Sequence, residues 1–232
     1  MMALQETTPA QTQSARLRMS YDEYRAWVDE DAHTEWVDGE VIVFMPPKEH
    51  HQSVLGFLYS LLSQYVQLLE LGRVLMAPFE VKLRRGHSYR EPDVLFVATE
   101  NLARLSEDRL EGPPDLIVEI ISADSVHRDR HTKFGEYADA GIREYWIIDP
   151  RPRRQAADFF RLNDQSEYEL FATEADEKVV SQVLPGFWLR PTWLWQADML
   201  APLTALMEIR GLSSEQIQQV QNLLTQERAE NE

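Results

Sequence analysis

The chain has 232 residues, which is enough for one substantial hydrophobic core, and its formal net charge is −16. The absence of cysteine excludes disulfide bonds and thiolate metal sites, and it fits a reducing cytoplasm. No apolar run approaches the roughly 20 residues that a membrane span needs. Because residues 1–20 also lack the apolar core of a signal peptide, we expect a soluble cytoplasmic protein with no membrane-spanning segment.

The acidic charge is concentrated in two segments. Residues 21–40 contain eight acidic residues and one basic residue, and residues 164–178 contain six and one. Taken alone, an acidic protein matches nucleic acid poorly, because nucleic acid requires a basic surface. Three groups of basic residues lie between the two segments: Arg73, Lys82, Arg84, Arg85 and Arg90; Arg128, Arg130 and Lys133; Arg143, Arg151, Arg153 and Arg154. They either form a positive cleft, with Arg128 and Arg130 as candidate DNA contacts, or are ordinary solvated side chains.

The N-terminal part of the chain changes character near residue 19. Residues 1–18 are polar and aperiodic, and we expect them to be disordered. The motif Ser20-Tyr21-Asp22-Glu23 is a capping-box pattern and predicts a helix from Tyr21 to about Asp29. We therefore expect one domain over residues 19–202 and a helical extension over residues 203–232.

A predicted hairpin and a predicted long helix follow. The Asp38-Gly39 pair lies between two extended runs within residues 34–44, which is a strong pattern for a β-hairpin. Apolar residues at three- and four-residue spacing predict a helix from Glu49 to Leu71, ended by Gly72. His51 lies on the apolar stripe of this helix, where a histidine is either a satisfied structural residue or part of a site.

A first isolated carboxylate precedes an apolar strand. Residues 73–85 contain strand-like positions, and Asp93 leads into the apolar run Val94–Val97. Pro92 suits a strand start because it lacks a donor N–H. Asp93 alone is an ordinary charged residue at the start of a strand, and it indicates a site only if a second carboxylate lies beside it.

The second carboxylate lies inside the most informative stretch, residues 113–150. The apolar run Leu116–Ile121 predicts a buried strand that Glu119 interrupts, and a helix follows from about Arg130 to Ala140, ended by Gly141. Residues 145–148 then form another apolar strand. This order favours parallel pairing through a right-handed crossover.

Glu119 needs a partner, because an unpaired buried carboxylate costs several kcal/mol or shifts its pKa. Lys133 lies on the inner side of the following helix, four residues before Tyr137. Asp93 and Glu119 are hard oxygen ligands of the kind that Mg²⁺ prefers, and a nearby lysine can orient the attacking water or stabilise charge on a phosphate. The competing interpretation is a structural salt bridge from Glu119 to Lys133 or Arg128 that holds the helix to the sheet.

The C-terminal third predicts short strands and a terminal helix. Residues 157–162 and 167–172 alternate like two antiparallel strands, and residues 179–180 and 187–189 add short pieces. A polar helix from Glu215 to about Arg228 has a narrow apolar stripe. Such a helix either docks on the body of the protein or pairs with another subunit, which leaves a homodimer open.

Several motifs together resemble the Uma-two family of bacterial proteins, which are assigned to restriction endonucleases within the PD-(D/E)XK nuclease superfamily. The resemblance covers about residues 20 to 200. The motifs that carry it are Glu35, Asp38-Gly39-Glu40, His51-Gln52-Ser53-Val54, Glu91-Pro92-Asp93, the stretch from Pro114 to Ser122, Asp129 to Lys133 with Tyr137, and the stretch from Gly141 to Pro150.

The resemblance implies an α/β (α+β) fold, in which a restriction-endonuclease-like mixed sheet is flanked by helices, with an N-terminal hairpin and a C-terminal helical tail. It also implies DNA as the substrate and Mg²⁺ (or Mn²⁺) as the cofactor, held by Asp93, Glu119 and the backbone carbonyl of Ile120. The superfamily lysine usually stands two residues after the glutamate, where this chain has Ile121. The resemblance implies that Lys133 has taken over that role.

Three further residues match the family pattern as accessory positions, namely Glu40, His51 and Tyr137. The function that follows is a Mg²⁺-dependent endonuclease that hydrolyses DNA phosphodiester bonds. Two alternatives stay open because kinship of fold does not establish activity. One is an inactive nuclease-fold module that binds DNA or a protein partner, and the other is a purely structural ion network.

Overall fold

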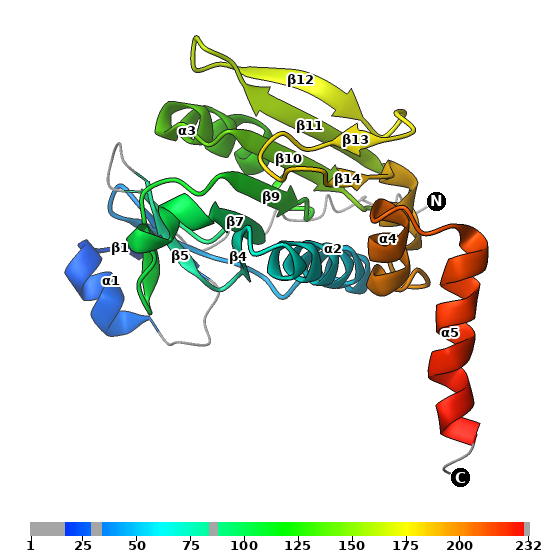
Figure 1. The fold of residues 1–232 in the computed structure, drawn as a ribbon. Coiled ribbons are helices and arrows are strands. Elements are labelled where there is room, and N and C mark those ends of the chain that lie inside the picture. Colours follow the sequence, from blue (N-terminus) through cyan, green and yellow to red (C-terminus); the bar gives the residue numbers. More distant parts are fainter. Residues whose placement is uncertain (1–16, 29–33, 84–87, 230–232) are drawn as a thin grey trace, which may run out of the picture.

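Two six-stranded mixed sheets carry most of the chain (Figure 1). The computed structural model describes residues 17–28, 34–83 and 88–229. Most of the predicted disordered segment, residues 1–16, lies outside the described residues. No helix in those three ranges is long and apolar enough to cross a membrane.

The large sheet contains the predicted parallel unit. Strands β9 and β10 pair in parallel, with Tyr145 opposite Ile117, and the other neighbouring pairs are antiparallel. This result confirms the predicted strand–helix–strand crossover. In spatial order the strands are β12 (Tyr168–Thr173), β11 (Ala156–Leu162), β10 (Glu144–Asp149), β9 (Leu116–Ile120), β7 (Val94–Ala98) and β4 (Gly72–Met76).

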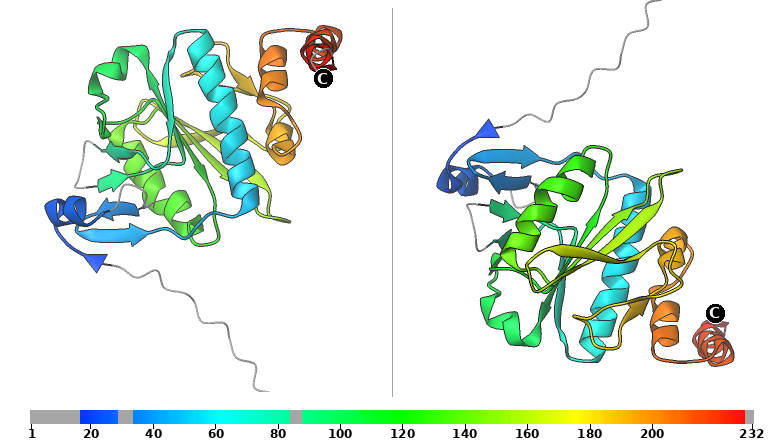
Figure 2. Two further views of the ribbon diagram at one scale, coloured as in Figure 1. Left: turned by 90° about the horizontal axis from the view of Figure 1, so that it is seen from below. Right: turned by 90° about the horizontal axis from the view of Figure 1, so that it is seen from above.

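Helices cover both faces of the large sheet. Helix α2 (Glu49–Leu68) lies on one face and helix α3 (Lys133–Ala140) on the other (Figure 2). Alternate residues of β9 therefore enter different cores, since Val118 packs with the α2 residues and Ile117 packs with Tyr137 of α3. Glu119 shares the face of Ile117, so its side chain projects toward α3.

The small sheet contains the predicted hairpin. Asp38 and Gly39 form its turn with φ angles of 47° and 83°, and Trp36 pairs with Val41 across it. Helix α1 (Tyr21–Trp27) begins with the predicted capping box at Ser20. In spatial order the strands are β1 (Leu17–Arg18), β3 (Glu40–Val43), β2 (Thr34–Val37), β6 (Ser88–Arg90), β5 (Glu80–Lys82) and β8 (Arg109–Glu111).

The chain crosses between the two sheets twice before Glu119, once from β4 to β5 and once from β6 to β7. Strand β4 belongs to the large sheet and β5 to the small one, and the chain then returns through β6 to β7. Pro78 and Pro92 lie at these crossings, where a residue without an N–H donor interrupts no ladder. Asp93 therefore lies between the sheets, directly before β7.

The predicted end of the long helix was wrong. Helix α2 stops at Leu68, the chain reverses at Glu70 with φ 53°, and Gly72 begins β4. Gly72 has φ 146°, and a Cβ atom there would lie 2.0 Å from the carbonyl oxygen of Val97. This glycine therefore permits close strand pairing and does not cap the helix.

The C-terminal region supplies a second layer against α2. The short strands β13 (Val179–Val180) and β14 (Trp188–Leu189) pair with each other and lead into a 3₁₀ turn, η3 (Pro191–Gln196), and helix α4 (Pro202–Ile209). The predicted terminal helix is present as α5 (Ser214–Ala229) and extends away from the body of the protein (Figure 1). A further 3₁₀ turn, η1 (Thr99–Arg104), follows β7.

Candidate active site

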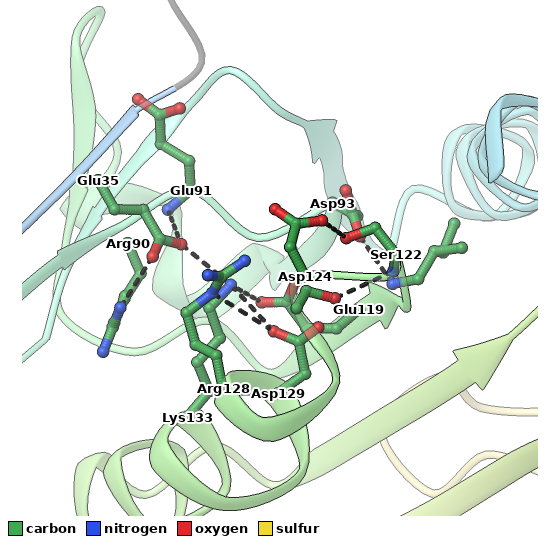
Figure 3. A network of polar contacts seen from close by, with 12 residues as sticks. Glu35, Arg90, Glu91, Asp93, Glu119, Ser122, Asp124, Arg128, Asp129 and Lys133 are labelled. Carbon is green, nitrogen blue, oxygen red and sulfur yellow. Dashed lines mark hydrogen bonds and ion pairs between the residues drawn. The ribbon is translucent and has the colours of Figure 1, made fainter. Parts of the chain in front are cut away.

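The two predicted metal ligands meet at the carboxyl end of β9. Val94 pairs with Val118 in the antiparallel β7–β9 ladder, so continuing that register by one residue sets Asp93 opposite Glu119. Asp93 Oδ2 accepts a hydrogen bond from the backbone N–H of Ile120 at 2.7 Å. Both side chains are largely buried, and Figure 3 shows them on the same side of the strand end.

Lys133 reaches this place from the crossover helix. A π-helical turn, η2 (Arg128–Thr132), precedes α3, and Lys133 is the first residue of α3. Its Nζ atom lies 2.8 Å from Glu119 Oε1, and the hydroxyl of Tyr137 donates to the same oxygen at 2.7 Å. The i,i+4 spacing thus directs both side chains onto one carboxylate, as expected for that spacing.

The small sheet adds a carboxylate that has no exposed surface. Glu35 of β2 forms one ion pair with Lys133 at 3.0 Å and another with Arg90 of β6 at 2.8 Å (Figure 3). Arg90 also donates two hydrogen bonds to Glu136 of α3, at 2.9 and 2.7 Å. These contacts connect the small sheet to α3 through the lysine.

Asp129 brings a further carboxylate from the π-helical turn. It is 1% exposed, and its Oδ1 atom has no hydrogen-bond partner among the residues that the structure describes. Its nearest cations are Lys133 at 3.7 Å and Arg128 at 4.0 Å. Arg128 itself lies over the ring of Phe44, 4.6 Å from its centroid.

His51 contacts the site from the first turn of α2. Its Nε2 atom lies 3.5 Å from Asp93 Oδ2, and its Nδ1 atom is buried without a hydrogen-bond partner within the described ranges. Burial lowers the pKa of this imidazole, but interactions with Asp93 and with the Ile120 carbonyl outweigh burial and raise it. The imidazole therefore lies against Asp93, one of the predicted metal ligands.

One lysine serves three carboxylates, and their pKa values show the competition. Burial disfavours ionised Glu35, but Lys133 and Arg90 overcome that cost and hold its pKa at about 2. Burial raises the pKa of Glu119 to about 8. Lys133 acts in the opposite direction and lowers this pKa, but the negative charge of Asp129 partly offsets the lysine. Burial also raises the pKa of Asp129. The pKa of Lys133 is raised against burial by its carboxylate neighbours, so it keeps its charge.

The side chains fit a magnesium ion better than a zinc ion. Across residues 17–28, 34–83 and 88–229, no three His, Asp or Glu side chains form a ready cage for a metal. Magnesium keeps several waters and needs only one or two protein carboxylates, whereas structural zinc needs four protein ligands. The carboxylates Glu35, Glu119 and Asp129 also share one buried cation, Lys133, and Asp93 lies beside Glu119.

Other predicted residues lie away from this centre or already have partners. Glu40 lies beside the hairpin turn and pairs with Arg18 at 2.7 Å. Arg130 pairs with Asp158 at 2.6 Å. Ile121 is fully buried in the apolar cluster of α3. Among the accessory candidates, the structure thus brings His51 and Tyr137 to Asp93 and Glu119, and Glu35 is the hairpin carboxylate that reaches Lys133.

Sequence reasoning assigned no role to Glu35, Arg90 or Asp129. Glu35 carried a usable signal, because it interrupts the short strand Thr34–Val37 just as Glu119 interrupts β9. Asp129 begins one of the stretches that carry the family resemblance, but its residue type and spacing assign it no chemistry. Arg90 had no signal of its own, since it lies in a polar stretch that also fits a solvated surface.

The family comparison covers most of this chain. The family model "Uma2: Putative restriction endonuclease" matches residues 21–192. The "Uncharacterized protein sll1609" of Synechocystis sp. (strain ATCC 27184 / PCC 6803 / Kazusa) is 26% identical over 121 residues. That alignment covers 50% of this chain and 66% of the relative, so the chain spans just under two thirds of its length.

A solved structure shares the fold. The crystal structure of a "putative nuclease belonging to DUF820 from Anabaena variabilis ATCC 29413" aligns with a TM-score of 0.63 at 18% identity. The alignment covers 77% of this chain and 98% of that chain. At this identity the likeness establishes a common fold, and it confirms the predicted α+β architecture of mixed sheet flanked by helices.

Proposed function

This chain belongs to the Uma2 family, and from that premise we propose that it is a Mg²⁺- or Mn²⁺-dependent endonuclease that hydrolyses phosphodiester bonds in DNA. One observation carries the proposal. Asp93 and Glu119 converge at a strand end together with a buried lysine and two additional carboxylates, so that one lysine is shared by three carboxylates with Asp93 beside them. Like charges held close repel one another, and a divalent cation relieves that repulsion.

The metal would be held by Asp93, Glu119 and the carbonyl of Ile120. When bound, a divalent ion polarises a phosphoryl oxygen and makes a bound water more acidic. His51 and the Ile120 N–H hold Asp93 in place, and Tyr137 fixes the orientation of Glu119. These contacts preorganise the ligands before substrate arrives.

Lys133 supplies the positive charge for the reaction. Its ammonium group stays charged because Glu119, Glu35 and Asp129 surround it. A fixed cation beside the ligands can orient a water molecule or stabilise the charge that develops on a phosphate. Glu35 and Arg90 act as positioning residues, since they touch the lysine or its partner and hold the ammonium group near the strand end.

The same contacts also support a structural alternative. The three carboxylates that pair with Lys133 are all buried, and two of them come from different sheets, as in a structural network that holds α3 to both sheets. Under this alternative the protein is an inactive nuclease-fold module that binds DNA or a protein partner.

Metal binding and cleavage together separate these alternatives. We expect millimolar Mg²⁺ or Mn²⁺ to raise the melting temperature and to support cleavage of a mixture of single- and double-stranded DNA. Asp93→Asn combined with Glu119→Gln should remove both effects, because neutral amides neither repel each other nor hold the cation as strongly. A wild-type melting temperature that does not respond to either metal would favour the structural network.

A further inference from the structure

A cavity of about 380 Å³ lies at the first turn of α2, the turn that also supplies His51 to the candidate active site. His50 lines this cavity, while the next residue, His51, points to Asp93. Pro150 also lines it; this residue directly follows β10, and β10 is the parallel neighbour of β9. The cavity and the carboxylate site therefore lie at the same ends of two adjacent strands, and the first turn of α2 contributes a residue to each.

The walls of the cavity suit a flat aromatic ring. The half-buried Trp195 of η3 lines it together with Leu194, Pro150 and Val54 of α2. Its volume falls within the range of about 300–1,000 Å³ that is usual for pockets that hold small ligands. An aromatic side chain in such a pocket stacks any nucleobase, because every base has a π-face.

The charges of the cavity favour a base over a phosphate. The carboxylates of Glu49 and Asp198 line it, and they repel a phosphate but accept hydrogen bonds from the exocyclic amino groups of bases. The cation among the lining residues is Arg153, which is exposed, has φ 65° and makes no ion pair with any described residue. A non-glycine residue held in this strained conformation often has a functional reason, and here it presents a guanidinium group at the edge of a base-sized cavity.

We propose that this cavity binds an unstacked nucleobase, and that the substrate is therefore DNA with unpaired nucleotides next to the phosphate that is cut. The inference rests on the proposed nuclease function. A base inside a duplex is stacked on both faces and cannot lie against Trp195, so only a single strand, a flap or an extruded nucleotide can use the cavity. Arg153 contacts the backbone phosphate outside the cavity, and Glu49 and Asp198 favour bases that carry an amino group.

Binding without cleavage tests the cavity independently of catalysis. Fluorescence anisotropy with EDTA present compares a short labelled oligodeoxycytidine, the same strand with one abasic nucleotide, and a blunt duplex. We expect Trp195→Ala to weaken single-strand binding about 5- to 150-fold, which corresponds to the loss of about 1–3 kcal/mol for one stacked base. Trp195→Phe should retain most of the affinity, and the matched control Trp27→Ala, at an exposed tryptophan of α1, should retain all of it.

A second variant guards against a local folding defect at Trp195. Ser53 lines the cavity from the half-exposed side of α2, and Ser53→Leu adds volume there while removing only an exposed hydrogen bond to Glu49. We expect the same selective loss of single-strand binding. Equal losses for duplex and single strand, or no loss in either variant, would overturn the proposal. Metal-dependent cleavage by both variants with wild-type preference would leave the nuclease function intact and reject the base cavity, whereas single-strand binding by an inactive wild type would reject the nuclease and retain the cavity.

Discussion

Glu119 near the end of β9 and Glu144 at the start of β10 are both buried glutamates on neighbouring parallel strands, yet their surroundings differ. Four neutral groups donate to Glu144, namely the backbone N–H groups of Gln182 and Val183, the Ser181 hydroxyl and the Trp146 indole N–H. Glu119 instead receives one hydroxyl and one lysine, and that lysine is shared with two more carboxylates. Glu144 is satisfied locally, whereas Glu119 shares its cation with Glu35 and Asp129.

The pKa alone does not separate the two sites. Burial is the largest cause at both glutamates, and it raises the pKa of each. What distinguishes them is the kind of partner. The carboxylate of Glu144 receives a neutral donor for each lone pair, so it anchors the loop at residues 181–184. Glu119 competes with other carboxylates for one cation, which is the arrangement of a site that can accept a second cation.

The largest expected difference between the two regions lies in activity. Lys133→Ala should lower cleavage by about 10²–10³-fold, the usual effect of removing one preorganised charge-stabilising group. Both proposed metal ligands remain, so the metal-dependent shift in melting temperature should persist. Single-turnover cleavage measures the first effect and thermal denaturation the second. Lys82→Ala, at a half-exposed lysine paired with Glu111, is the matched control and should cleave normally.

A compensating variant examines whether charge at this position is what matters. Ile121 is two residues after Glu119, so its side chain shares that face of the strand. Adding Ile121→Lys to Lys133→Ala should restore part of the activity, less than wild type, because rate depends on close placement of the reacting groups. The buried lysine should cost roughly 1–3 kcal/mol of stability. Wild-type activity in Lys133→Ala alone would remove this lysine from the mechanism.

Glu144 should respond in stability and not in activity. In Glu144→Gln an amide N–H₂ must face groups that donate, so at least one donor loses its acceptor. We expect a loss of about 1–3 kcal/mol in the free energy of unfolding. Urea denaturation measures this loss, and cleavage per folded molecule should equal that of wild type. A selective loss of cleavage in this variant would contradict the distinction between the two glutamates.

The raised pKa of Glu144 predicts how the stability of wild type relative to Glu144→Gln changes with pH. Its pKa is raised in the folded protein, mainly by burial. A raised folded pKa means that its contribution is fully present below the unfolded value of about 4.3 and is lost as pH rises through the folded value. The stability difference between wild type and Glu144→Gln should therefore shrink as pH rises. Denaturation of both proteins at a series of pH values gives this difference, and a difference that grows with pH would mean that the charged form is the stabilised one.

The smallest expected effect concerns the predicted DNA contacts. Arg128 lies over Phe44 beside the site, whereas Arg130 already pairs with Asp158. If both approach DNA phosphates, Arg128→Ala should reduce the salt dependence of binding by about one unit of slope, and Arg130→Ala by less, because its charge is partly neutralised by Asp158. Binding titrations at several salt concentrations measure the slopes, and unchanged slopes in both variants would place the DNA elsewhere.

Much of the fold followed from local patterns. The capping box at Ser20 and the hairpin turn at Asp38-Gly39 are short-range features with few alternative solutions, and both are present. The division of the strands between two sheets was not predictable in the same way. An apolar strand pairs equally well in either sheet, and the choice depends on contacts that form only when the chain is assembled.

The sequence by itself determined that Glu119 needs a partner and that Lys133 and Tyr137 lie together on the crossover helix, because two- and four-residue periodicities set those directions. Only the tertiary structure decided that Glu35 and Arg90 of the small sheet reach the same lysine. An ion pair depends on which carboxylates compete for a cation at a distance of a few ångströms. Residues far apart in the chain enter that competition only after the two sheets have packed together.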